Sequence, residues 1–204
     1  KIIKKYKVKK KLEITLELNP DDFSKDYLTK IQMIGINRIS LGVQSFDDFD
    51  MKLLNRSHNS IQSIKALDFI SNLYDNFSID LIYGIPYSSI EKWKNNLKNA
   101  LKYKPPHLSC YSLTLESNTV LQYKVKNGEI ELLDEEFIKE QYNYLVEELE
   151  KKGYRNYEFS SFSIPGYYAI NNSNYWNGKP YLGIGPSAHS YNGKSIRSWN
   201  ISNN

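Results

Sequence analysis

Strand-like and helix-like segments alternate along most of this chain, and this alternation limits the possible folds more than any other feature of the sequence. The strand-like segments are residues 12–20, 38–46, 77–86 and 105–116. The helix-like segments are residues 24–35, 47–56, 60–74, 89–104 and 134–153. Connections of helical length between strands are typical of parallel sheets with right-handed crossovers. The sequence therefore predicts an α/β fold with four consecutive βα units.

Local signals place the ends and faces of some of these segments. Ser24 is a suitable N-cap for the first helix, and Gly35 is a suitable stop, because glycine accepts the left-handed conformation at a helix C-terminus. Further along, Trp93, Leu97 and Leu101 are spaced four residues apart. This spacing predicts an apolar helix face that packs against the sheet.

The character of the sequence changes after Gly153. Residues 154–204 are rich in Tyr, Ser, Asn and Gly, a composition typical of short strands and ordered loops. We therefore expect two domains. Residues 1–153 form the βα units, and residues 154–204 form the start of a C-terminal α+β extension.

Charge, apolar runs and cysteine content exclude several classes of protein. The net charge is +4, but basic and acidic residues are interspersed except in the opening KIIKKYKVKKK, which we interpret as a solvated helix face and not as a nucleic-acid site. No apolar run approaches the roughly 20 residues of a membrane span and no signal peptide opens the chain, so we expect a cytoplasmic protein. Cys110 is the only cysteine, which excludes a disulfide framework and a CxxC metal site, and we expect it to be a small core residue.

Polar residues at the predicted strand ends are the first candidates for a functional site, because the active sites of parallel α/β barrels lie at the C-terminal ends of the strands. Glu17, Gln44 and Asp80 occur in three of the strands, and Arg56 follows shortly after Gln44. A carboxylate in a buried strand is unfavourable unless it is paired. Glu17 and Asp80 therefore indicate either a charged ligand pocket or internal ion pairs with an arginine and no ligand.

A set of short motifs, taken in order and with their separations, resembles a known family. The motifs are EITLELNP, GINRISLGVQSF, LLNRSH, SIDLIYGIP, PPHLSCYSLTLE, YEFSSFSIPG, NYW and YLGIGPSAHS. They span nearly the whole chain and resemble the radical S-adenosylmethionine (SAM) family of oxygen-independent coproporphyrinogen III oxidases and HemW haem chaperones. The resemblance implies a partial (β/α)6-type barrel, without its first strands, that binds SAM beside a [4Fe–4S] cluster.

The same resemblance implies which residues contact SAM. Glu17, Gln44, Arg56 and Asp80 fall on the family's SAM-binding positions. A carboxylate such as Glu17 suits the ammonium and sulfonium charges of the ligand, Gln44 offers an amide, and Arg56 suits the ligand carboxylate as a bidentate clamp. Asp80 either accepts hydrogen bonds from the ribose hydroxyls or holds Arg56 in place.

The sequence departs from the family pattern at the cluster site. The family's CxxxCxxC loop and GGTP-type strand end are absent, and one cysteine does not hold a cluster that needs several thiolates. Because the chain begins with Lys1 and not with methionine, we interpret it as a fragment whose cluster ligands lie upstream of Lys1, in preference to a degenerate relative. We expect no radical chemistry from these residues alone.

Motifs near the C-terminus bear on the choice between chaperone and oxidase. The stretch NNSNYW resembles the HNxxYW motif of HemW proteins, but Asn171 stands at the position of the histidine and is not a normal axial ligand of haem iron. Tyr175 and Trp176 either stack on a porphyrin or pack the C-terminal module onto the barrel. His189, in GIGPSAHS, is either a contact in a SAM or haem pocket or an ordinary loop histidine.

The other two histidines have structural interpretations. His107 stands at the start of the fourth strand, where we expect a structural role. His58, in NRSHNS, is expected to brace the turn that holds Arg56.

These patterns predict a HemW-like haem chaperone that binds haem and SAM and passes the haem to an acceptor protein that the sequence does not identify. Two alternatives remain. One is an oxygen-independent coproporphyrinogen III oxidase (coproporphyrinogen dehydrogenase) of haem biosynthesis, and the other is a binding module without a cluster. The sequence assigns no catalytic residue.

Overall fold

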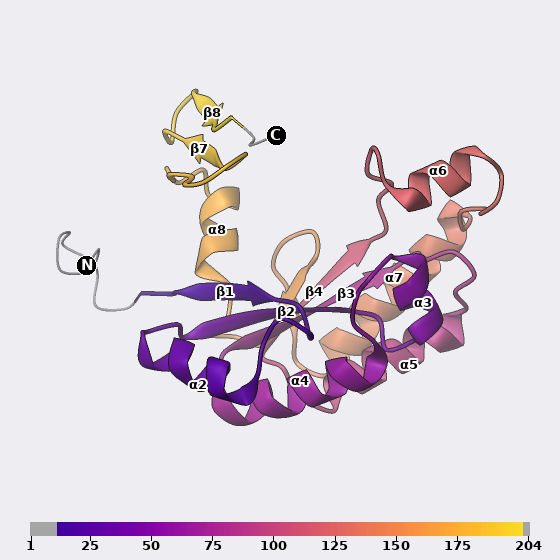
Figure 1. The fold of residues 1–204 in the computed structure, drawn as a ribbon, viewed down its shortest axis with the longest axis horizontal. Coiled ribbons are helices and arrows are strands. Elements are labelled where there is room, and N and C mark those ends of the chain that lie inside the picture. The colour runs from indigo at the N-terminus through magenta and orange to yellow at the C-terminus, as the bar shows by residue number, and fades with distance from the viewer. Residues whose placement is uncertain (1–11, 202–204) are drawn as a thin grey trace. The chain divides into compact units, whose positions relative to one another are not determined.

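The chain folds into two compact units, residues 1–167 and residues 168–204, and both are drawn in Figure 1. The computed structural model describes residues 12–201, so the opening stretch KIIKKYKVKKK and the helix face predicted for it lie outside the described residues. The first unit extends past Gly153, because two short strands that follow this residue pair with its sheet.

Strands and helices alternate through the first unit, as the sequence predicts. In order they are β1 (Thr15–Leu18), α2 (Lys25–Met33), β2 (Arg38–Gln44), α3 (Asp48–Leu53), α4 (Ser60–Leu73), β3 (Phe77–Tyr83), α5 (Ile90–Leu101), β4 (His107–Ser112), α6 (Val120–Lys126), α7 (Glu135–Lys151), β5 (Arg155–Asn156) and β6 (Ser161–Ser163). The short helix α6 was not predicted. Within residues 12–201, the structure contains no helix with the length and apolar character needed to cross a bilayer.

Six strands form one sheet in the order β1-β2-β3-β4-β6-β5. The first four strands are parallel neighbours, which confirms the four predicted βα units. Strands β6 and β5 extend the sheet in antiparallel fashion beyond β4. The order of the parallel strands follows the chain, so their C-terminal ends all lie at one edge of the sheet.

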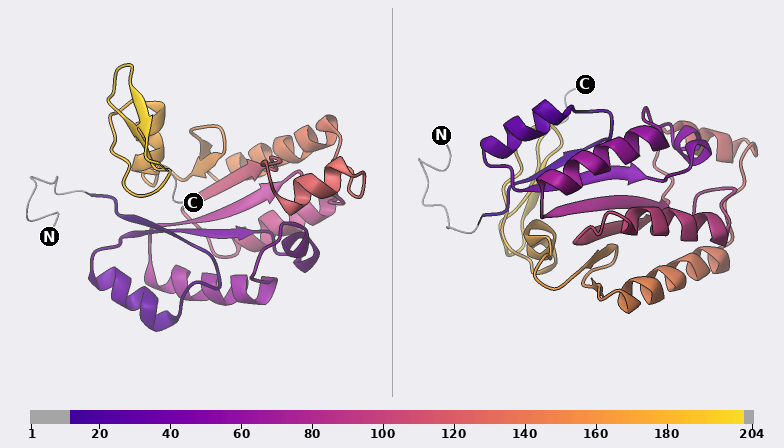
Figure 2. Two further views of the ribbon diagram at one scale, coloured as in Figure 1. Left: turned by 45° about the horizontal axis from the view of Figure 1, so that its top comes forward. Right: turned by 90° about the horizontal axis from the view of Figure 1, so that it is seen from below.

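Helices α2, α4, α5 and α7 lie on one face of this sheet (Figures 1 and 2). The strands present alternate aliphatic residues to that face, and Ile39, Leu41 and Val43 of β2 are completely buried there, as are Ile79 and Leu81 of β3. Each such side chain contributes about 1.5–3 kcal/mol to the free energy of unfolding by its removal from water. The hydrophobic core therefore lies between the sheet and one layer of helices.

The helix ends and the apolar helix face predicted from the sequence occur at the expected residues. Ser24 Oγ accepts a hydrogen bond from the Tyr27 backbone N–H at 3.2 Å, which caps α2. Gly35 has a φ of +105°, the left-handed conformation that ends this helix. On α5, Trp93 and Leu97 are buried in the core and Leu101 packs against it, so the predicted apolar face is confirmed.

The second unit is small and contains one helix and a two-stranded sheet. Helix α8 (Ile170–Trp176) is followed by β7 (His189–Tyr191) and β8 (Arg197–Trp199), which pair in antiparallel fashion. An isolated bridge between Tyr181 and Tyr191 ties the intervening loop to β7. This arrangement confirms the predicted α+β character of the C-terminal extension.

Candidate functional site

The sheet face opposite the helices carries hydroxyl, carboxyl and imidazole groups, and we call it the polar face. Its residues are Glu17 of β1, Arg38, Ser40 and Gly42 of β2, Ser78 and Asp80 of β3, His107, Ser109 and Tyr111 of β4, and Ser161 and Ser163 of β6. Parallel sheets normally have two apolar faces, because helices cover both of them. A face this polar is costly for folding alone and indicates a binding surface.

Asp80 lies in the middle of the polar face and is bound by serine hydroxyls. Ser40 Oγ lies 3.1 Å from both carboxylate oxygens of Asp80, and Ser78 Oγ donates to Oδ1 at 3.1 Å. Burial raises the pKa of Asp80 to about 6, although the serine hydroxyls and the Arg38 charge act in the opposite direction. Among residues 12–201, Asp80 forms no ion pair with Arg56, so serines hold this carboxylate instead of an arginine.

Gln44 ends β2 in a strained conformation. Its φ is +66°, and the Ser45 backbone N–H donates across it to the Val43 carbonyl at 2.8 Å. This is a γ-turn of the rare form with a positive central φ. The register with β3 also shifts between Gly42 and Gln44, as in a β-bulge. Strain of this kind is concentrated at functional sites, where it directs a side chain.

The γ-turn places the amide of Gln44 over the polar face. A Cβ built on Gly42 would lie 2.7 Å from Gln44 Nε2 and 3.4 Å from Asn19 Oδ1, so a side chain at position 42 would displace the Gln44 amide. Gly42 is paired with Asp80 in the sheet. The structure therefore brings Gln44 and Asp80 together on one face, at the end of the sheet where the sequence predicted a site.

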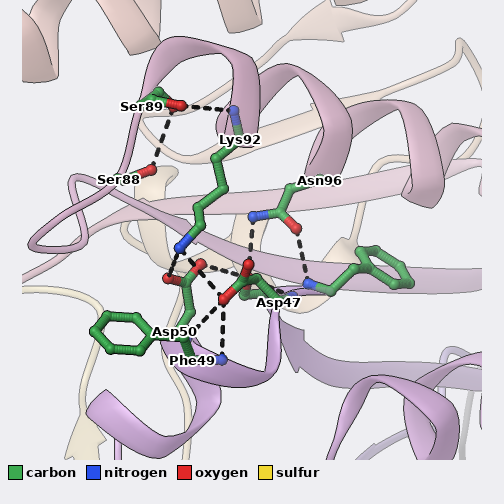
Figure 3. A network of polar contacts seen from close by, with 9 residues as sticks. Asp47, Phe49, Asp50, Ser88, Ser89, Lys92 and Asn96 are labelled. Atoms are coloured by element: carbon green, nitrogen blue, oxygen red, sulfur yellow. Dashed lines mark hydrogen bonds and ion pairs between the residues drawn. The ribbon is translucent and has the colours of Figure 1, made fainter.

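A network of polar contacts fixes the loop that follows the γ-turn (Figure 3). Ser45 Oγ donates to Asp50 Oδ2 at 2.7 Å and accepts from Asn96 Nδ2 at 3.0 Å, while Asn96 Oδ1 accepts from the Phe46 backbone N–H at 2.8 Å. Lys92 Nζ then binds Asp50 Oδ1 at 2.8 Å. These contacts anchor the loop to α5. They hold the residues after Gln44 in place, so that the γ-turn does not relax to an unstrained conformation.

Lys92 is the only cation that pairs with Asp50 in the described part of the chain, and it also lies 3.3 Å from Asp47 Oδ1. Burial alone would lower the pKa of Lys92, but Asp50 and Asp47 outweigh that effect and raise it. The Asp50 side chain is almost completely buried, so this ion pair is the compensation for a buried charge. Sequence reasoning missed the pair, because one helix and one strand separate its members in the chain.

Glu17 is exposed at the polar face and paired with Ser40 in the register of β1 and β2. Tyr111 of β4 extends over the same face. Burial raises the pKa of Tyr111, and the charges of Asp80, Glu158 and Glu17 raise it further, whereas a hydrogen bond with Ser109 lowers it. Sequence reasoning also missed Tyr111; the alternation of His107, Ser109 and Tyr111 along β4 was the signal available.

Arg56 lies in the connection between α3 and α4, and its side chain is exposed. It forms no ion pair within residues 12–201, and it is near enough to His58 to lower the pKa of that imidazole, although burial is the larger cause. His58 is buried, with Nε2 3.4 Å from the Val43 carbonyl oxygen and Nδ1 3.7 Å from Asp21 Oδ1. It therefore joins the connection that bears Arg56 to the end of β2.

The second unit has a pocket of about 480 Å³. Its lining combines α8 with the loop before β7 and consists of Asn171, Tyr175, Tyr181, Leu182, Gly183, Ser187, Ala188 and His189. The rings of Tyr175 and Tyr181 meet edge to face at 4.5 Å. The structure thus brings together Asn171, Tyr175 and His189, whereas Trp176 is not part of the lining.

A close approach of two backbone segments shapes this pocket. A Cβ on Gly183 would collide with the carbonyl oxygen of His189, so only glycine fits at position 183. The Gly183 N–H also donates to Ser190 Oγ at 2.9 Å. Gly183 of YLGIGPSAHS therefore lets the His189 backbone pack against the loop.

The residues of this chain do not fit a [4Fe–4S] cluster. Cys110 is the only cysteine, and it is buried in the core, as predicted. Burial raises the pKa of its thiol, which opposes formation of the thiolate that a metal requires. No group of His, Cys, Asp and Glu side chains within residues 12–201 forms a metal site either.

Comparison with known proteins agrees with this geometry. Residues 1–100 match the radical SAM superfamily. The chain is 36% identical over 180 residues to heme chaperone HemW of Lactococcus lactis subsp. lactis, covering 88% of this chain and 48% of the relative. It is 37% identical over 178 residues to heme chaperone HemW of Escherichia coli (strain K12), covering 87% and 46%. The chain therefore spans about half the length of the curated relatives it matches.

Solved structures show the same fold. Coproporphyrinogen III oxidase (HemN) from Escherichia coli, a radical SAM enzyme, superimposes with a TM-score of 0.77 over 94% of this chain and 46% of the enzyme, at 24% identity. Elp3 from the archaeon Methanocaldococcus infernus superimposes with a TM-score of 0.58 over 66% of this chain and 32% of that protein, at 30% identity. At 24% identity the HemN likeness bears on the fold alone.

A sheet of parallel βα units with a polar face, together with the family match, defines a protein of the radical SAM class. Within that class the chain belongs with the HemW-like proteins. The predicted family and the predicted fold, a partial radical SAM barrel, are confirmed.

Proposed function

We propose that the polar face binds SAM. Asp80 accepts hydrogen bonds from the ribose hydroxyls, and the neighbouring Gln44 presents its amide to the nucleoside. Glu17 faces the ammonium and sulfonium charges of the ligand, and the exposed guanidinium of Arg56 clamps its carboxylate. The strained backbone of Gln44 supports this assignment, since nothing in the fold of the core requires an amide at the end of β2.

We also propose that the pocket of the second unit receives haem. His189 is the candidate ligand of the iron, because it lines the pocket and the neighbouring Asn171 is not a normal ligand. The rings of Tyr175 and Tyr181 and the side chain of Leu182 provide an apolar wall for the porphyrin. Trp176, which is exposed on the same helix, contacts the rim of the bound haem.

The function that follows is that of a haem chaperone, which binds haem and SAM and passes the haem to an acceptor protein. The observation that carries this proposal is the pocket that unites Asn171 and Tyr175 of α8 with His189 of β7. The similarity to HemW relatives supports it, because the matched regions cover nearly nine-tenths of the chain.

Two assays on the full-length protein test this function. Anaerobic titration with haem should give a saturable Soret band, and incubation with coproporphyrinogen III, SAM and a reductant should give no product. Conversion to protoporphyrinogen IX would assign the protein to the oxidases instead. Absence of haem binding together with absence of conversion would leave a SAM-binding module.

The proposed haem ligand has a matched control in the same pocket. His189→Ala should change the Soret band, because it removes the imidazole, whereas Asn171→Ala should leave the band nearly unchanged. An unaltered spectrum in the His189 variant would remove this residue as the ligand.

A further inference from the structure

A line of hydrogen-bonding side chains runs across the polar face and ends at Asp80. Tyr157 Oη lies 2.7 Å from His107 Nε2, and His107 Nδ1 lies 2.8 Å from Ser78 Oγ. Ser78 Oγ lies 3.1 Å from Asp80 Oδ1. Both His107 and Ser78 are completely buried, so water does not compete for these contacts.

The protons of this line have one consistent arrangement when Asp80 is ionised. A carboxylate only accepts, so Ser78 donates its single proton to Asp80. Ser78 Oγ then accepts from His107 Nδ1–H. Burial, together with the Arg38 charge, lowers the pKa of His107 to about 3, so the imidazole is neutral and its Nε2 accepts from Tyr157 Oη–H. All three donors therefore point toward the carboxylate.

Other charged groups also face Asp80. Arg38 of β2 stabilises the ionised carboxylate. Burial raises the pKa values of Cys110 and Tyr111 of β4, and the Asp80 charge raises them further, so both stay neutral. The charges of Glu158 and of Glu17 of β1 also raise the pKa of Tyr111. The line of donors joins Asp80 on the polar face to the half-buried Tyr157, beyond β4.

We propose that Tyr157, His107 and Ser78 form a positioning relay that orients the Asp80 carboxylate and stabilises its charge, so that it accepts hydrogen bonds from the ribose hydroxyls of SAM. This inference rests on the proposed role of Asp80 as a SAM ligand. The relay residues do not touch the ligand. They act through the position and ionisation of Asp80, and chains of polarised hydrogen bonds strengthen one another in a buried setting.

Tyr154 offers a matched control for Tyr157. Its hydroxyl donates at 2.6 Å to the carbonyl of Pro105, two residues before His107, and this hydrogen bond does not lead to Asp80. Tyr154→Phe and Tyr157→Phe each remove one hydroxyl and one short hydrogen bond. A purely structural effect is common to both variants, whereas an effect on Asp80 belongs to Tyr157 alone.

The test measures the titration of Asp80 directly in the full-length protein, by ¹³C NMR of labelled aspartate carboxyl carbons, with Asp80→Asn to assign the signal. Ser78→Ala should move the midpoint upward by about one pH unit and Tyr157→Phe by roughly half a unit, since each removes stabilisation of the charge. His107→Asn keeps an N–H donor near the position of Nδ1, so it should retain part of the hydrogen bond to Ser78 Oγ. Tyr154→Phe should leave the midpoint unchanged.

Calorimetric titration with SAM across the same pH range separates this inference from the function on which it rests. The midpoint of SAM binding should move with the Asp80 midpoint in each variant. Unchanged Asp80 midpoints in both Ser78→Ala and Tyr157→Phe would overturn the relay. If the Asp80 midpoint moves and SAM binding does not follow it, the relay is upheld and the role of Asp80 as a SAM ligand is wrong.

Discussion

The side-chain amide of Gln44 occupies the space above Gly42 that a β-carbon would fill, because a Cβ at position 42 would lie 2.7 Å from Gln44 Nε2. The two residues therefore act as one unit. Gly42 leaves this space free, and the γ-turn directs the Gln44 amide into it.

Gly42→Ala should displace that amide and weaken SAM binding about tenfold, which corresponds to the loss of roughly one hydrogen bond. Isothermal titration of the full-length protein with SAM measures the effect. In a Gln44→Ala background the same Gly42→Ala change should have little further effect, because the displaced group is already gone. Additive losses of affinity in the double variant would contradict the proposed contact.

Lys92→Met should lower the free energy of unfolding by about 3 kcal/mol, because it leaves the buried Asp50 carboxylate without its cation. It should also weaken SAM binding, since the loop after Gln44 loses its anchor to α5. Lys94→Met is the matched control on the same helix: Lys94 is exposed and lies over the Tyr144 ring at 5.1 Å. Urea denaturation should show a loss of less than about 1 kcal/mol for Lys94→Met. Equal losses would contradict the importance of the buried pair.

Asp80 and His107 give opposite pH dependences to the stability of the fold. Burial raises the pKa of Asp80 from 3.8 to about 6, so its contribution to stability is present below the lower value and lost as the pH rises through the higher one. Burial lowers the pKa of His107 from 6.5 to about 3, so its contribution is present above the higher value and lost as the pH falls through the lower one. In the pH range where the two pKa shifts overlap, the contributions of Asp80 and His107 to stability oppose each other.

Asp80→Asn should therefore remove the opposing contribution of Asp80 and leave the pH dependence of stability that His107 causes. Its stability in urea should fall more steeply than that of the wild type as the pH decreases from about 6 to about 4. Near neutral pH the variant should be more stable than the wild type by up to about 3 kcal/mol, because the unfavourable buried charge is removed. The same pH slope in both proteins would mean that Asp80 does not titrate in this range.

Asn171→His should supply an imidazole where HemW proteins have the motif histidine. We expect haem to bind about tenfold more tightly with a shifted Soret band, because the pocket then offers a second imidazole. Asn172→His is the control, since this neighbour does not line the pocket. Equal spectra for the two variants would argue against haem in this pocket.

The fold was predictable because its signals are local. Alternating apolar residues marked the strands, and Ser24 and Gly35 marked the ends of a helix. The polar end of β2 also identified Gln44 from the sequence. The contact between Lys92 and Asp50, the reach of Tyr111 over the polar face and the line from Tyr157 to Asp80 depend on register and helix packing between distant segments. No spacing within a single element encodes such contacts, so the structure was needed to find them.

Among residues 12–201, helices α2, α4, α5 and α7 all cover the same face of the sheet (Figures 1 and 2), and this has an evolutionary consequence. The aliphatic face fixes the architecture, whereas most side chains on the opposite face are not required by the core. Mutations at exposed positions of that face, such as Tyr111, therefore change what it recognises with a small risk of unfolding. A lineage that retains this scaffold is able to diverge in what it binds while its descendants continue to fold.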